Sequence, residues 1–84
     1  MKVRLRVTVM KKPGVLDPEG KAIGQALHTL GFTGIEDVRA GKVIELDLDA
    51  ESEAAAEAAA AEMAKRLLAN GVIERARIER IAAA

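Results

Sequence analysis

The amino-acid sequence predicts an α+β fold, with an antiparallel sheet that carries two helices on one face. Stretches in which apolar and polar residues alternate are separated by stretches in which apolar residues recur every three or four positions. The 84 residues are enough for a single domain, residues 1–84, with one core. Only one residue is aromatic and much of the apolar content is alanine, so we expect that core to be thin.

The first strand is predicted at the N-terminus, where Val3, Leu5, Val7 and Val9 alternate with polar residues. A helix follows, with an apolar stripe at the spacing i, i+3, i+4, i+7 that consists of Ile23, Ala26, Leu27 and Leu30. Asp17 is its predicted N-cap, Pro18 its first residue and Gly31 its end. Gly20 lies on the stripe side, where a missing side chain would let the helix approach the sheet closely.

A hairpin is predicted next, with strands at 35–39 and 43–49 and a turn at 40–42. Residues 51–69 then form a helix whose apolar stripe is Ala56, Ala60, Met63, Ala64 and Leu67. Asn70-Gly71 ends this helix, residues 72–81 return as a strand, and Ala82–Ala84 are expected to form a frayed tail.

The resulting order is β-α-β-β-α-β. Right-handed crossovers then favour a ferredoxin-like sandwich with strand order 4-1-3-2, in which the first strand is antiparallel to the third and fourth. Lys2, Arg4 and Arg6 share one face of the first strand, and Glu45, Asp47 and Asp49 share one face of the third. We expect these charges to meet on the helix-free face, either as intrachain ion pairs or as part of a polar interface.

The connector between the first strand and the first helix, residues 11–20, is unusually specific. Pro13-Gly14 is a turn dipeptide, and the apolar Val15 and Leu16 precede the helix cap. Such a loop is expected to dock onto this chain or onto a partner. A plain strand-to-helix connector is the alternative interpretation.

Several function classes are disfavoured by composition and spacing. Lys and Arg balance Asp and Glu at 13 each, and aromatic stacking residues are scarce, which argues against nucleic-acid binding. Absence of cysteine excludes disulfides and thiolate zinc sites. Gly20-Lys21 and Gly41-Lys42 lack the spacing of a phosphate-binding loop. We therefore predict no catalytic, cofactor or metal residue in this chain, and without a signal peptide or long apolar run we expect a cytoplasmic location and no membrane contact.

Two places in the sequence nevertheless invite a chemical interpretation. His28, the only histidine, could act as a general base, but its place off the helix stripe favours a solvated residue. Glu36 and Asp37 could bind a metal, but neighbours in a strand point to opposite faces.

The connector sequence Lys-Pro-Gly-Val-Leu-Asp-Pro-Glu-Gly at 12–20 resembles the PurS family, the small subunit of phosphoribosylformylglycinamidine synthase. The resemblance continues through Val-Arg-Ala-Gly-Lys at 38–42 and the Glu-Leu pair at 45–46, and it resumes at 63–70 and 72–74. The chain departs from the family pattern at Asn70-Gly71, where Asn-Pro is expected. Both pairs end a helix.

The resemblance implies a non-catalytic subunit that assembles the complex and supports glutamine-dependent activity through ammonia transfer. Its partners would be a large synthetase subunit, which is expected to carry ATP and Mg²⁺, and a glutaminase subunit. A homodimer or a dimer of dimers is also implied. The candidate partner interface consists of Lys12, Pro13, Gly14, Val15, Leu16, Asp17, Arg39, Gly41, Lys42 and Asn70.

Two other hypotheses fit the same element order. One is a stand-alone dimeric ligand-sensing module of the ACT type, with an effector site near the connector. The other is a small ferredoxin-like enzyme, which the lack of a catalytic constellation disfavours.

Overall fold

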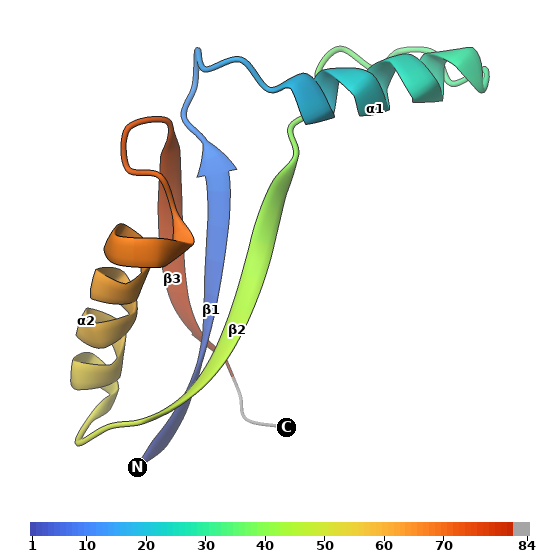
Figure 1. Ribbon diagram of the computed structural model, residues 1–84. Coiled ribbons are helices and arrows are strands. Elements are labelled where there is room, and N and C mark those ends of the chain that lie inside the picture. Colours follow the sequence, from blue (N-terminus) through green and yellow to red (C-terminus); the bar gives the residue numbers. More distant parts are fainter. Residues whose placement is uncertain (82–84) are drawn as a thin grey trace.

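The computed structural model describes residues 1–81, so the tail predicted at Ala82–Ala84 lies outside the described residues. Its centre is an antiparallel sheet of three strands in the order β2-β1-β3 (Figure 1). The strands are β1 (Lys2–Lys11), β2 (Gly41–Asp49) and β3 (Glu74–Ile81). The central β1 pairs antiparallel with both neighbours, as the predicted strand order requires.

The predicted charge ladder is confirmed in register. The ladder pairs Lys2 with Asp49, Arg4 with Asp47 and Arg6 with Glu45. Arg4 forms a two-point contact with Asp47, with Nε 2.7 Å from Oδ1 and Nη2 3.1 Å from Oδ2. Hydrogen bonding to Arg4 lowers the pKa of Asp47 from its ordinary value, and the same contact raises the pKa of Arg4. Arg4 and Arg6 therefore form intrachain ion pairs with Asp47 and Glu45 on the face that carries no helix, whereas Asp49 pairs with the Met1 amino group.

The core lies on the opposite face, under α2 (Glu53–Met63). Ser52 caps this helix, since its hydroxyl oxygen accepts a hydrogen bond from the Ala55 backbone N–H at 3.0 Å. The buried helix residues are small, and they pack against the apolar side chains of β1: Ala56, Ala60 and Ala64 on the helix, with Val3, Leu5, Val7 and Val9 on the strand. Alanine on this face lets the helix lie close to the sheet, which makes the core thin, as predicted.

The predicted second helix stripe is correct at Ala56, Ala60 and Ala64 and wrong at Met63 and Leu67, which are 37% and 82% exposed. The helix continues as a π-helical turn, η1 (Ala64–Leu68), closed by a hydrogen bond from the Ala69 N–H to the Ala64 carbonyl. A π turn holds one residue more than an α turn, so the inward position moves from Leu67 to Leu68. Leu68 accordingly packs on the core.

The other helix, α1 (Pro18–Thr29), does not cover the sheet. It projects away beyond one end of β1 and β2, and the chain returns beside it before entering β2 (Figure 1). We call residues 12–40, which include this helix and the returning chain, the arm. The α+β class and the antiparallel sheet are confirmed. Of the two helices that were predicted to lie on one face of the sheet, only α2 lies there.

The predicted hairpin is also different in the structure. Residues 32–40 form no strand, and the predicted turn at 40–42 is absent because β2 starts at Gly41, opposite Met10. Gly41 is packed tightly there, since an added Cβ would collide with the Val9 carbonyl and the Met10 sulfur. The sequence 35–39 thus leads straight into β2 without reversing direction. At the other end of the chain, Val72 and Ile73 lie in a turn, and β3 starts at Glu74.

Candidate interaction site at the base of the arm

The base of the arm is tied by the carboxylate of Asp17, the N-cap of α1. Its Oδ1 accepts a hydrogen bond from the Gly20 backbone N–H at 3.0 Å, and its Oδ2 accepts one from the Ala40 N–H at 2.8 Å. The side chain is only 6% exposed. One buried carboxylate therefore joins the start of α1 to the residue directly before β2.

Two cations complete this arrangement. Lys11 Nζ lies 3.8 Å from Asp17 Oδ1, and Arg39 Nε lies 4.0 Å from Oδ2. The Arg39 Nη2 also donates to the carbonyl oxygens of Lys11 and Lys12, at 2.9 and 3.2 Å. We call Lys11, Asp17, Gly20, Arg39 and Ala40 the clasp, because they hold together the end of β1, the start of α1 and the start of β2.

Hydrogen bonds from the backbone N–H groups of Gly20 and Ala40 lower the pKa of Asp17 below its ordinary value, and Lys11 and Arg39 act in the same direction. Burial opposes them by raising it. The clasp thus contains an ionised carboxylate at neutral pH.

Gly20 brings α1 against the returning chain. A Cβ at this position would collide with the Val38 carbonyl oxygen and crowd the Asp17 carboxylate. One turn later, Gly24 faces the side chain of Val38. The close approach predicted for Gly20 is therefore real, but its neighbour is the segment 35–39 and not the sheet.

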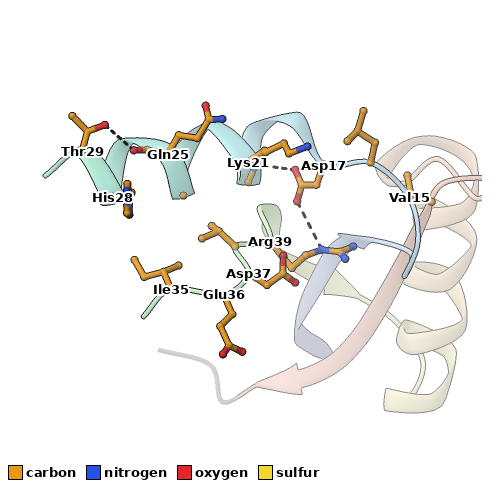
Figure 2. Close-up of a pocket in the computed structure, with 14 residues that line it drawn as sticks. Val15, Asp17, Lys21, Gln25, His28, Thr29, Ile35, Glu36, Asp37 and Arg39 are labelled. Carbon is orange, nitrogen blue, oxygen red and sulfur yellow. Dashed lines mark hydrogen bonds and ion pairs between the residues drawn. The ribbon is translucent and has the colours of Figure 1, made fainter. Parts of the chain in front are cut away.

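An open groove of about 660 Å³ runs between α1 and residues 35–39 (Figure 2). Leu16, Ile35 and Val38 supply apolar lining, while Lys21 and His28 line it from the helix. His28 is exposed, in agreement with the prediction of a solvated helix residue. The apolar stripe of α1 does not line this groove, so the arm has two separate surfaces.

The structure brings the candidate interface residues to one end of the molecule. Lys12 donates from Nζ to the Gly71 carbonyl at 2.7 Å and from its backbone N–H to the Ile73 carbonyl at 2.8 Å. Asn70, in the same turn, accepts a hydrogen bond from the Val72 N–H. At the end of β1, three parts of the chain therefore meet: the connector, the start of β2 and the turn at residues 70–73.

The individual roles of these residues differ. Pro13 and Gly14 form the exposed tip of the connector, where Gly14 has a φ of 83°. Val15 is half-buried, whereas Leu16 is 67% exposed. Gly41 and Lys42 belong to β2, opposite Met10 and Val9. Lys11 and Ala40 are not among the predicted interface residues, because nothing in the sequence shows that the Asp17 carboxylate binds a residue 23 positions later.

Within residues 1–81 no group of three His, Cys, Asp or Glu side chains is placed to hold a metal ion. In the same range no helix has both the length and the apolar character needed to cross a bilayer. The groove offers apolar contact and the clasp offers charge, and both can position a partner.

Comparison with known proteins gives the family. Residues 4–82 match the family model PurS, described as phosphoribosylformylglycinamidine (FGAM) synthase. The chain belongs to the PurS family. It is 48% identical to the PurS subunit of phosphoribosylformylglycinamidine synthase from Synechocystis over 82% of this chain and 69% of that protein. It is 41% identical to the PurS subunit from Bacillus subtilis, over 90% of this chain and 89% of that one.

Solved PurS structures share the shape described above. The PurS crystal structure from Methanocaldococcus jannaschii, described as one subunit of formylglycinamide ribonucleotide amidotransferase, covers 100% of both chains with a TM-score of 0.84 and 36% identity. A chain of the PurLQS structure from Thermotoga maritima covers 96% of this chain and 99% of that one, with a TM-score of 0.88 and 25% identity. The open placement of the arm is therefore compatible with the family fold, and the ACT-type hypothesis is not supported.

Proposed function

We propose that this PurS-family chain is the small, non-catalytic subunit of a phosphoribosylformylglycinamidine synthase in purine biosynthesis, and that it holds a synthetase and a glutaminase subunit together. The observation that carries the proposal is the match over nearly the whole chain to a member of the Thermotoga maritima PurLQS assembly. The chain's own residues support it. A binding role needs accessible surface, and the arm exposes a large share of the apolar side chains.

The candidate docking surface is the end of the molecule where the connector, the clasp and the 70–73 turn meet. Leu16 is 67% exposed there, and Val72 is 81% exposed. Exposed apolar residues rimmed by charged ones, here Lys12 and Lys42, are typical of a protein interface. The candidate residues from Lys12 to Asp17, with Arg39, Gly41, Lys42 and Asn70, would form or support this surface.

In this proposal the chemistry takes place on the partners. ATP and Mg²⁺ would bind to the large synthetase subunit, and glutamine would be hydrolysed on the glutaminase subunit. The present chain would bring the two into the geometry in which ammonia passes from one to the other. It would act in the cytoplasm as a homodimer or a dimer of dimers.

The test is an assay of formylglycinamidine ribonucleotide formation with and without this protein, using glutamine or free ammonia as nitrogen donor. We expect the glutamine-dependent rate to require the chain, while a high concentration of ammonia bypasses much of that need. The chain alone should hydrolyse neither ATP nor glutamine. Equal glutamine-dependent rates without the protein would refute the assembly role. Loss with both donors would show that the chain acts on the synthetase site itself.

A further inference from the structure

The turn that joins η1 to β3 contains the only asparagine of the chain, Asn70, and Gly71 follows it directly (Figure 1). Both residues are exposed. A glycine after an asparagine leaves its backbone nitrogen open to approach the side-chain amide, because glycine has no Cβ to shield that nitrogen. Within residues 1–81 the Gly71 N–H makes no hydrogen bond, and nothing lies within 4 Å of a Cβ built there. The Gly71 nitrogen is therefore free to react.

The turn folds the Asn70 side chain over this nitrogen. Asn70 Oδ1 accepts a hydrogen bond from the Val72 backbone N–H at 3.0 Å, so the side chain reaches across Gly71 to the residue beyond it. This bond holds the amide carbon, Asn70 Cγ, on the side of the Gly71 nitrogen. Because Oδ1 is the acceptor, the bond also makes Cγ more electrophilic and stabilises negative charge that develops on Oδ1 during an attack.

The nucleophile is assisted by two further hydrogen bonds. The Gly71 nitrogen shares its peptide bond with the Asn70 carbonyl, whose oxygen accepts from the Ile73 N–H at 3.1 Å and from the Glu74 N–H at 2.7 Å. When the Gly71 nitrogen loses its proton, resonance places part of the negative charge on this oxygen. Two backbone donors stabilise that charge. The turn thus favours both the attacking nitrogen and the carbon that it attacks.

We propose that Asn70 is a site of spontaneous deamidation, with water as the only co-reactant. The Gly71 nitrogen loses its proton to solvent and forms a bond to Asn70 Cγ. The bond between Cγ and Nδ2 breaks, and Nδ2 takes up a proton and leaves as ammonia. The resulting cyclic succinimide is hydrolysed at either of its two carbonyls, which gives aspartate or isoaspartate at position 70. Gln25, the only other side-chain amide of the chain, lies inside α1 and stays intact.

The isoaspartate product loosens the turn, because the backbone then runs through the former side chain and gains a methylene. Lys12 is bound to this turn twice, from Nζ to the Gly71 carbonyl at 2.7 Å and from its backbone N–H to the Ile73 carbonyl at 2.8 Å. The new carboxylate also lies beside Glu74, whose Oε1 accepts from the Asn70 N–H at 2.7 Å. Longer backbone and like charge both weaken the connection between Lys12 and the start of β3.

The direct test is peptide mapping by mass spectrometry after the folded protein has been incubated at neutral pH below its melting temperature. Cleavage after Arg66 and Arg75 isolates residues 67–75, which contain Asn70. We expect this peptide to gain the mass that replaces NH₂ by OH and to become a substrate of isoaspartyl methyltransferase, while the peptide 22–39 with Gln25 stays unchanged. A sample taken at time zero corrects for change during digestion. An unchanged peptide 67–75 would overturn the proposal.

Gly71→Ala is the matched variant. Its Cβ meets no atom within 4 Å, so the turn should be retained, but the methyl group shields the nitrogen and should slow the reaction at least about tenfold. Circular dichroism checks the fold of the variant. Equal rates with glycine and alanine would contradict attack by this nitrogen.

The contribution of the turn is measured against a synthetic peptide of residues 67–75. The folded chain should react at least as fast as this peptide, because the turn holds the reacting groups together and stabilises the developing charges. A folded chain that reacts more slowly than the peptide would overturn the role assigned to the three hydrogen bonds of the turn.

The effect on the turn is measured by hydrogen exchange. Protein enriched in isoaspartate should lose protection at the Lys12 and Ile73 amides, and unchanged protection would overturn the loosening. The turn belongs to the candidate docking surface, so the modified chain should also support a lower glutamine-dependent rate, a step that rests on the proposed function. Equal rates with fresh and modified chain would overturn this step. A rate that does not require the fresh chain would refute the proposed function alone.

Discussion

Asp17 Oδ2 accepts a hydrogen bond from the Ala40 backbone N–H at 2.8 Å, across 23 residues of sequence. This bond crosses the base of the arm, since Asp17 starts α1 and Ala40 precedes β2. The same carboxylate caps the helix through Gly20. One side chain thus sets both where the helix begins and how the arm leaves the sheet.

The pH dependence of the clasp follows from this contact. The folded-state pKa of Asp17 lies below the ordinary value of 3.8, so the ionised carboxylate stabilises the fold. That stabilisation is complete above about 3.8 and is lost as the pH falls through the lower folded-state value. We expect Asp17→Asn to weaken hydrogen-exchange protection of the α1 amides at neutral pH, and the difference from the unsubstituted protein to vanish under acid. A difference that grows on acidification would contradict this assignment.

Gly20→Ala tests the close approach of α1 to Val38. Alanine normally stabilises a helix interior by roughly 0.5–1 kcal/mol relative to glycine. Here the added Cβ meets a backbone carbonyl, so we expect a net destabilisation of about 2 kcal/mol or more instead. Hydrogen exchange of the α1 backbone amides and thermal melting measure this loss of stability. Gly71→Ala is the control, because nothing lies within 4 Å of a Cβ there.

Ala60→Leu tests the thin core. Ala60 is fully buried between α2 and β1, and a larger side chain must push the helix from the sheet. We expect a cost of about 1–3 kcal/mol in chemical denaturation. Ala61→Leu makes the same chemical change at an exposed position of the same helix and should change stability by less than about 0.5 kcal/mol. Similar effects at both positions would be inconsistent with the packing described.

Gly14→Val should destabilise the connector, because Gly14 has a φ of 83° and a β-branched residue is strained there. We expect a cost of about 1–3 kcal/mol. Gly14→Asn should cost less, since asparagine tolerates the left-handed region. A steric clash cannot be the cause of this destabilisation, because nothing lies within 4 Å of a Cβ added to Gly14. Equal melting temperatures for the two variants would exclude backbone strain as the cause.

Leu16→Ser separates docking from folding. Leu16 is largely exposed, so the isolated chain should melt within about 2 °C of the unsubstituted protein. Binding to the synthetase and glutaminase subunits in a pull-down should nevertheless weaken if the connector is a docking surface. Ala58→Ser, exposed on α2, serves as the control that should leave both unchanged. A large drop in melting temperature with normal binding would assign Leu16 to the fold instead.

The sequence by itself determined the elements whose signals are local. Alternation in residues 2–9 defines β1 and its buried face, and the Asp17-Pro18 pair marks the start of α1. Even the register of the charge ladder could be predicted, because Arg4 and Arg6 have acidic residues at matching spacing on the strand that pairs with β1. Connector and turn motifs also carried the family resemblance.

Only the tertiary structure decided where the arm goes. Periodicity cannot show whether residues 40–42 turn or continue, since that depends on the pairing of Gly41 with Met10 and on a carboxylate 23 residues earlier. Nor does it show the π turn that replaces Leu67 by Leu68 in the core, because one extra residue in a helical turn changes the phase of every later position. Both outcomes depend on contacts between distant parts of the chain, which local residue patterns do not encode.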